Sequence, residues 1–203
     1  VTVPLVTKSD GTKFGKTETG TVWISANMTS PYALYQFWLN VADADVYRYL
    51  KFYSFLSVNE IEEIEQSDKN SQGRREAQSI LAAEVTELLH GAAGLTAARR
   101  ISDALFSGNI AQLTNEDLDQ LELDGLPCTV FAGGNKGIVE VLVDTDLAKS
   151  NKMAREFVGN NAINVNGQLV DSVNFELDVS NALNGKYFLL KRGKKLFHLA
   201  KFV

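Results

Sequence analysis

The sequence has few of the residues on which several protein classes depend. It contains one cysteine, Cys128, so no disulfide can form within the chain. Its only histidines, His90 and His198, are too few for a zinc site built from Cys and His. Three prolines and 15 glycines among 203 residues exclude collagen-like and low-complexity chains. No run of about 18 apolar residues occurs, so the sequence predicts no membrane contact.

What is present is an ordinary globular composition. Apolar residues make up 45% of the chain and charged residues 22%, which is enough for a sizeable core in one or two domains. The amino-terminal residues lack the basic and apolar segments of a signal peptide, so we expect a cytoplasmic protein. The first residue is valine, which favours an origin within a longer protein.

The net charge of −5 conceals a basic carboxyl-terminal region. Residues 149–203 contain nine Lys and Arg against four Asp and Glu, whereas residues 1–148 contain 11 against 21. Residues 186–203 carry six cations and no acid, which is typical of a surface that meets phosphate groups. The acidic balance of the whole chain therefore does not exclude RNA as a partner.

Residues 29–124 have the pattern of a helical bundle. Ser30 offers an N-cap hydroxyl and is followed by proline, which together predict the start of a helix. Asp43 is expected to cap the next helix. Apolar residues then recur at three- and four-residue spacing up to Gly91, the expected C-cap of a longer helix.

The remainder has the pattern of a small α+β domain. Pro127 and a pair of glycines predict a connector over residues 125–136. Short helices are expected over about 137–147 and 150–159, followed by a hairpin at the Asn166–Gly167 pair. A second hairpin is expected around the cationic turn at residues 191–195. The predicted fold is thus a mainly α-helical bundle followed by a small α+β domain.

A loop near the amino terminus, here called the lysine loop (residues 11–17), carries two ammonium groups. Lys13 and Lys16 flank Gly15, an arrangement that suits a mobile clamp on a polyphosphate because lysine supplies a point charge and glycine lets the loop close. The loop differs from a Walker A motif, since it has three residues between its glycines where four are needed and no helix-forming sequence after it. The alternative to a phosphate clamp is a turn that is merely solvated. A short strand is expected before it, at residues 2–6.

The sequence Lys13-Phe14-Gly15-Lys16-Thr17 resembles the second signature, or KMSKS loop, of bacterial tyrosyl-tRNA synthetases in its KFGKT form. The resemblance continues through residues 29–38 and 43–52, which are similar to the start of the family's helical anticodon-binding domain. Residues 150–167 resemble the S-four-type RNA-binding module at the carboxyl terminus of these enzymes. Practically the whole chain is covered, in the order of the family.

The resemblance implies an aminoacyl-tRNA ligase, which joins tyrosine to its tRNA through a tyrosyl-adenylate formed from ATP. ATP is then a substrate, accompanied by Mg²⁺, and no tightly bound cofactor or protein-held metal is expected. Lys16 would bind an ATP phosphate, while Lys13 and Thr17 would help to hold the loop as pyrophosphate leaves. The Rossmann-like catalytic half, with its HIGH-type signature and tyrosine pocket, is missing. This chain by itself is therefore expected to be inactive.

The resemblance also implies a division of the chain and an oligomeric state. Residues 1–28 would end the catalytic domain, 29–124 would form the anticodon-binding domain, 125–136 a linker and 137–203 the S-four-type domain. Dimers of the family associate through the missing half, so a homodimer is expected for the full-length protein and a monomer for this chain.

The expected RNA-binding residues are cations of the last domain. Lys149, Lys152 and Arg155 have three-residue spacing, which predicts one helix face, and the cationic turn is expected beside it, so that together they form a basic groove. The full set is Lys149, Lys152, Arg155, Lys191, Arg192, Lys194 and Lys195. Asn151 stands where the module often has arginine, which weakens RNA contact, and Asn161 stands where it often has glycine, which Asn replaces because it tolerates a positive φ. A merely solvated basic face is the alternative.

Two other classes of function stay open. One is a non-enzymatic RNA-binding protein that joins an S-four-like module to a helical bundle. The other is a helical protein-interaction domain, which predicts no salt-dependent affinity for RNA. The aromatic residues between Tyr32 and Phe55 allow a base-stacking platform, although their helical spacing favours packing in the core.

Overall fold

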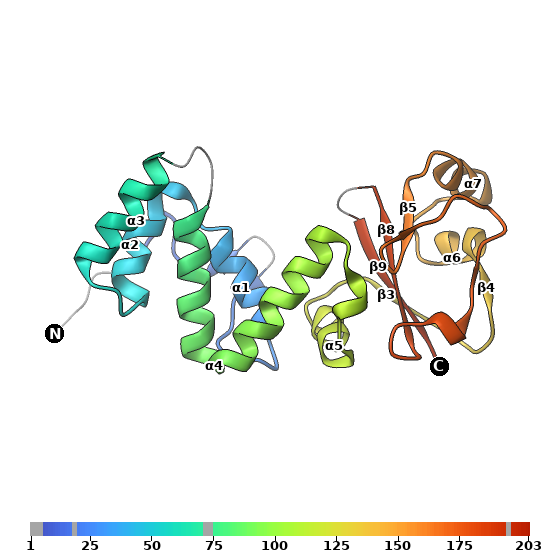
Figure 1. Cartoon of the computed structure of the whole chain (residues 1–203), viewed down its shortest axis with the longest axis horizontal. Coiled ribbons are helices and arrows are strands. Elements are labelled where there is room, and N and C mark those ends of the chain that lie inside the picture. Colours follow the sequence, from blue (N-terminus) through green and yellow to red (C-terminus); the bar gives the residue numbers. More distant parts are fainter. Residues whose placement is uncertain (1–5, 18–19, 71–74, 194–195) are drawn as a thin grey trace. The chain divides into compact units, whose positions relative to one another are not determined.

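The chain folds into two compact units, residues 1–99 and residues 100–203 (Figure 1). The computed structural model describes residues 6–17, 20–70, 75–193 and 196–203. The strand predicted at residues 2–6 therefore lies, apart from Val6, outside the described residues. Each unit has its own apolar core. Within the described ranges, no helix is long and apolar enough to cross a membrane.

The first unit is helical and begins with a short hairpin. Its elements are β1 (Lys16–Thr17), β2 (Gly20–Thr21), α1 (Pro31–Leu39), α2 (Asp43–Tyr53), α3 (Val58–Asn70) and the greater part of α4 (Glu76–Ser107). The hydroxyl of Ser30 accepts a hydrogen bond of 3.1 Å from the backbone N–H of Ala33, so the predicted N-cap of α1 is confirmed. Helix α4 is interrupted at Gly91, the position of the predicted C-cap, where φ of 69° and ψ of 176° are not helical.

The prediction that Asp43 caps α2 is wrong. The N-cap residue is Ala42, and no side chain caps this helix. The carboxylate of Asp43 instead accepts a hydrogen bond of 2.6 Å from the side-chain amide of Gln78 in α4. The carboxylate that the sequence predicts to accept from the backbone N–H groups of α2 therefore accepts from Gln78 of α4 instead.

The aromatic residues of the first unit belong mainly to its core, as their spacing favours. Tyr35, Trp38 and Tyr49 are buried, and the rings of Trp38 and Tyr49 meet edge to face at a centroid distance of 6.2 Å. Phe52 and Phe55 are the exposed members of this group.

The second unit is an α+β domain, as predicted. Its helices are η1 (Ile110–Gln112), α5 (Asn115–Leu123), α6 (Ile138–Asp144), α7 (Asn151–Gly159) and η2 (Val179–Asn181). Its strands are β3 (Cys128–Phe131), β4 (Lys136–Gly137), β5 (Ile163–Val165), β6 (Gln168–Leu169), β7 (Glu176–Leu177), β8 (Tyr187–Arg192) and β9 (Leu196–Phe202).

Five of these strands form one sheet in the order β3-β9-β8-β5-β6, in which only β3 and β9 are parallel. Helices α6 and α7 cover one face, and α5 lies on the other (Figure 1). The side chains of β8 alternate accordingly, because successive residues of a strand point to opposite faces. Phe188 and Leu190 enter the core shared with α6 and α7, whereas the hydroxyl of Tyr187 reaches α5.

Both predicted hairpins are present. Asn166 and Gly167 have φ values of 50° and 81° between β5 and β6, the positive pair that a type I′ turn requires. Strands β8 and β9 pair antiparallel from Tyr187 opposite Lys201 to Arg192 opposite Leu196. The second hairpin is therefore longer than its sequence pattern indicated, and it includes two of the cations assigned to the turn.

Residues 125–136 contain β3, which pairs with β9. Helix α5 is joined to the same sheet by side chains, because the Tyr187 hydroxyl donates to Asp119 at 2.7 Å and the Lys201 ammonium lies 2.9 Å from Glu122. Burial and the bond to Asp119 raise the pKa of Tyr187 to about 12. The stretch predicted as a connector thus runs between two elements of one compact unit, while the division into four segments stays a prediction.

Candidate functional site

The lysine loop follows a tight turn. The backbone N–H of Lys8 donates to the carbonyl of Thr12 at 2.8 Å, and Gly11 takes a φ of 81°. The carboxylate of Asp10 accepts hydrogen bonds from the backbone N–H and the hydroxyl of Thr12, at 2.8 and 2.6 Å. These bonds lower the pKa of Asp10 because they stabilise its charged form. The turn before the loop is therefore shaped by its own side chains.

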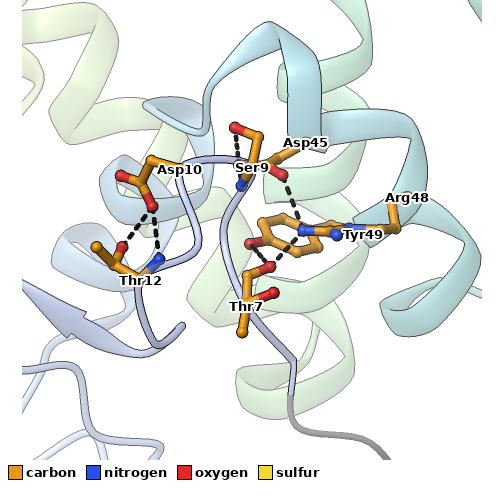
Figure 2. A network of polar contacts seen from close by, with 7 residues as sticks. All are labelled: Thr7, Ser9, Asp10, Thr12, Asp45, Arg48 and Tyr49. Carbon is orange, nitrogen blue, oxygen red and sulfur yellow. Dashed lines mark hydrogen bonds and ion pairs between the residues drawn. The ribbon is translucent and has the colours of Figure 1, made fainter.

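Helix α2 holds the segment that leads into this turn (Figure 2). The carboxylate of Asp45, which is only 3% exposed, accepts hydrogen bonds from the backbone N–H and the hydroxyl of Ser9 at 3.0 and 3.1 Å. Arg48 forms an ion pair of 2.9 Å with Asp45 and also donates to the carbonyl of Thr7. The hydroxyl of Tyr49 donates to the same carbonyl at 3.2 Å. We call Asp45, Arg48 and Tyr49 the loop anchor.

Phe14 fixes the middle of the lysine loop. Its ring lies 4.6 Å from the ring of Tyr49, 5.3 Å from that of Trp38 and 5.8 Å from that of Tyr53, measured between centroids. The adjacent Lys13 is exposed, and no ion pair with it is found in the described part of the chain. The turn and Phe14 are thus held to the helices, while an ammonium group remains in solvent.

The structure places the backbone of Lys16 and Thr17 in β1, opposite Thr21 and Gly20 of β2. Lys13 is paired across the turn with Thr7. Lys13 therefore closes the turn that begins at Thr7, whereas Lys16 and Thr17 belong to the hairpin that follows it. Their roles stay predictions.

The cations of the second unit are not arranged as the sequence predicts. Helix α7 begins at Asn151, behind Ser150, whose hydroxyl accepts a hydrogen bond of 3.3 Å from the backbone N–H of Met153. Lys149 therefore lies outside the helix, and it pairs with Asp146 at 3.1 Å. The expectation that Lys149 shares a helix face is wrong, because the serine is the better N-cap.

Lys152 and Arg155 do lie on α7 and are exposed. Arg192 brings the end of β8 beside this helix, since its guanidinium lies 4.9 Å from the ring of Phe157 and donates to the carbonyl of Leu147. Asn161, after the helix, takes the expected positive φ, with a value of 54°.

Lys191 is separated from these residues. It neighbours Arg192 in a strand and so points to the other face of the sheet, where its ammonium lies 5.0 Å from the ring of Phe197. The single groove that the sequence predicts therefore does not include Lys191. Lys194 and Lys195 lie outside the described residues.

Other reactive side chains have structural surroundings. Burial raises the pKa of the Cys128 thiol and so disfavours the thiolate. Burial lowers the pKa values of His90 and His198, and His198 is hydrogen-bonded to the hydroxyl of Thr129 at 2.9 Å. Among the residues that the structure describes, no group of His, Cys, Asp and Glu is arranged to hold a metal ion.

The loop anchor was missed by sequence reasoning. Asp45 and Arg48 have the three-residue spacing of a helical ion pair, which was the available signal. Nothing in that spacing, however, points to Ser9, which lies 36 residues away from Asp45.

Comparison with known proteins finds two matching families along the chain. Residues 1–107 match the family model described as tRNA synthetases class I (W and Y), and residues 117–200 match the tyrosine–tRNA ligase SYY-like C-terminal domain. The chain is 60% identical to the tyrosine–tRNA ligase of Aliivibrio fischeri (strain MJ11) and 53% identical to that of Chromobacterium violaceum. Each alignment covers 98% of this chain and 47% of the relative.

A solution structure of a tyrosyl-tRNA synthetase C-terminal domain is 37% identical, covering 49% of this chain and 100% of that one with a TM-score of 0.40. The chain spans about half the length of the curated relatives that it matches.

Proposed function

The chain belongs to the class I tRNA synthetases of the W and Y group, and from this premise we propose that it is the carboxyl-terminal, tRNA-binding part of a tyrosine–tRNA ligase. The full-length protein would attach tyrosine to its tRNA through a tyrosyl-adenylate formed from ATP. The observation that carries this proposal is the order of the two family matches, with a synthetase region followed by a tyrosine–tRNA ligase C-terminal domain. The KFGKT sequence of the lysine loop lies within the first match.

The lysine loop would act on the phosphates of ATP. When the carboxylate of tyrosine attacks the α-phosphorus, pyrophosphate leaves with the bonding electrons, and negative charge grows on its oxygens. Lys16 would bind these oxygens, and Lys13 and Thr17 would help to hold the loop, because ammonium groups stabilise charge that develops during reaction. The exposure of Lys13 supports this role. Mg²⁺ would accompany ATP mainly in the half of the enzyme that this chain lacks.

The second unit would bind the backbone of tyrosine tRNA. Its candidate contacts are Lys149, Lys152, Arg155, Lys191, Arg192, Lys194 and Lys195. The position of Arg192 beside α7 supports a shared surface with Lys152 and Arg155. By itself the chain would neither activate tyrosine nor dimerise, whereas the full-length protein would be a cytoplasmic homodimer.

Exchange of pyrophosphate into ATP tests the enzymatic part of the proposal. In the full-length protein, Lys16→Ala should lower the rate of tyrosine-dependent exchange about 10²- to 10³-fold, as the loss of one charge-stabilising donor does elsewhere. Lys51→Ala, which removes an exposed lysine from α2, is the matched control and should leave the rate unchanged. Normal exchange by Lys16→Ala would contradict the assigned role.

Titration with tRNA tests the binding part. The full-length protein should prefer tyrosine tRNA over an unrelated tRNA of equal length. Lys152→Ala and Arg155→Ala should each reduce the slope of log affinity against log salt by about 0.7–0.9, if each side chain neutralises one phosphate. Equal affinity for both tRNAs, with no tyrosine-dependent exchange in the full-length protein, would instead favour the non-enzymatic RNA-binding protein.

A further inference from the structure

The first turn of helix α2 carries a buried carboxylate that binds a distant part of the chain. One oxygen of Asp45 accepts both hydrogen bonds from Ser9, and the other pairs with Arg48 (Figure 2). Burial of a carboxylate is costly unless partners of this kind satisfy it. The bonds from Ser9 join residues that are 36 positions apart. Asp45 therefore ties α2 to the segment that enters the lysine loop.

Backbone bonds pass this attachment on to the lysine loop. The N–H of Phe14 donates to the carbonyl of Val6 at 3.3 Å, and Thr7 is paired with Lys13. These bonds close the turn to which Ser9 belongs. The arm of the turn that α2 holds therefore also fixes the arm in which the lysine loop begins.

The second arm of the turn meets the same helix. The ring of Phe14 lies 4.6 Å from that of Tyr49, between centroids, and Tyr49 follows Asp45 by four residues, about one turn of α2. One contact by itself would let the turn pivot on the helix. A polar contact before the turn and an aromatic contact after it together give the lysine loop a defined direction.

Stability alone does not explain a carboxylate at this place. Apolar side chains of similar volume often replace buried ion pairs with no loss of stability. Hydrogen bonds, in contrast, have narrow distance and angle requirements, so the bonds from Ser9 to Asp45 hold the turn at one position on α2. A reacting group needs such precision, because a misplacement of about 1 Å can lower a rate about 10²-fold.

We propose that Asp45 is a positioning residue for the formation of the adenylate. Through Ser9, it sets the place from which Lys16 reaches the departing pyrophosphate. Arg48 and the ring of Tyr49 support it in this task. The inference rests on the proposed function, because it takes the lysine loop as the group that binds phosphate. Asp45 touches no reacting atom and acts only through the loop.

Tyrosine-dependent exchange of pyrophosphate by the full-length protein tests this role. Asp45→Ala should lower kcat about 10- to 100-fold, because the ammonium groups of the loop are then displaced. The KM for tyrosine should stay unchanged, because the loop acts on ATP. Asp45→Asn keeps an oxygen that can accept from Ser9, so its kcat should lie between those of Asp45→Ala and the unaltered protein.

A double substitution distinguishes positioning from a merely structural role. When Lys16→Ala is already present, the ammonium group that Asp45 positions is gone. The effect of Asp45→Ala on kcat should then shrink to about 3-fold or less, because substitutions that act through one group are not additive in free energy. A loss of folded protein would lower the rate by the same factor with and without Lys16.

Asp43→Ala is the matched control. Asp43 is the other carboxylate in the first turn of α2, but it accepts a hydrogen bond from Gln78 of α4. Its removal should leave the exchange rate unchanged.

Ser9→Ala tests the same contact from the side of the turn, where Ser9 is exposed, and leaves α2 intact. It should lower kcat about 2- to 10-fold, the effect of one lost hydrogen bond. In Asp45→Ala, which has already lost the acceptor, Ser9→Ala should have no further effect.

The outcomes separate this inference from the proposed function. A normal kcat in Asp45→Ala, or an equal loss with and without Lys16→Ala, overturns the inference while the proposed function stands. Normal exchange in Lys16→Ala overturns the inference together with the role assigned to the lysine loop. A full-length protein that exchanges no pyrophosphate overturns the inference and the proposed function alike.

Discussion

The lysine loop and the β8–β9 hairpin are both cationic turns, but they are held in different ways. The segment before the lysine loop has an isolated backbone pair between Thr7 and Lys13, and β1 and β2 are two residues each. The β8–β9 hairpin has a continuous register, and both of its strands lie inside a five-stranded sheet. One turn therefore depends on its own side chains and on those of helix α2, and the other depends on its own backbone ladder.

The difference suits the two proposed tasks. A loop that closes on a phosphate must open and close, and segments with few backbone bonds open at low free energy. A surface for a folded RNA gains affinity when its groups are held in place before binding. The loop anchor and Phe14 act at a few points, so they restrain the lysine loop, whose strand β1 pairs with the two-residue strand β2 and not with the five-stranded sheet.

The largest expected effect is a loss of stability in the second unit, which contains the β8–β9 hairpin. Leu190→Ala removes a fully buried side chain from the core of the second unit, which should lower the free energy of unfolding by about 2–5 kcal/mol. Both tryptophans, Trp23 and Trp38, lie in the first unit. Urea unfolding should therefore show an earlier transition by circular dichroism and an unchanged transition by tryptophan fluorescence.

Leu81→Ala is the matched change in the first unit, where Leu81 is equally buried. It should shift the fluorescence transition instead. If either substitution moved both transitions together, the two units would unfold as one cooperative body, and their separate treatment would be wrong.

A smaller effect is expected at the loop anchor. Asp45→Ala leaves Arg48 and the hydroxyl of Ser9 without their shared acceptor, and the loss of such a partner costs about 1–3 kcal/mol. We expect the cost to appear as local opening, measured as faster amide hydrogen exchange at residues 8–14. Exchange in β8 and β9 should be unchanged.

Glu62→Ala, on the exposed surface of α3, is the control for the loss of a carboxylate and should leave loop exchange as it was. Unaltered protection of residues 8–14 in Asp45→Ala would show that Phe14 alone holds the loop.

The smallest expected effect is a dependence of stability on pH. Burial lowers the pKa of His198, although the charge of Asp146 opposes this shift. The unfolded state then takes up a proton at higher pH than the folded state does. Stability from this group is complete above the usual histidine pKa of about 6.5, and it is lost as pH falls from there through the lower pKa of the folded state.

When the pH is lowered from 7.5 to 5.5, the urea midpoint of the second unit should consequently fall. His198→Gln should abolish this fall. Burial also lowers the pKa of His90 in the first unit. The urea midpoint measured by tryptophan fluorescence should therefore still depend on pH in His198→Gln. A second unit that is equally stable at both pH values would contradict the assignment.

Sequence reasoning predicted the elements well where the deciding contacts are local. The N-cap at Ser30, the break in the helix at Gly91 and the turn at Asn166 and Gly167 are present. It failed for Asp43, whose carboxylate meets Gln78 of another helix. It also placed Lys191 and Arg192 in one groove, because it assigned both to a turn. Both belong to strand β8, where neighbouring side chains point to opposite faces of the sheet.

The sequence by itself determined the N-cap at Ser30 and the turn at Asn166 and Gly167, because these depend on residues a few positions apart. The role proposed for the lysine loop rests on its KFGKT pattern. Only the tertiary structure decided that Asp45 would hold Ser9 and that Asp43 would meet Gln78. The physical reason is that such contacts exist only after separate helices and strands have packed, and packing depends on the apolar faces of the elements rather than on the polar residues that it brings together.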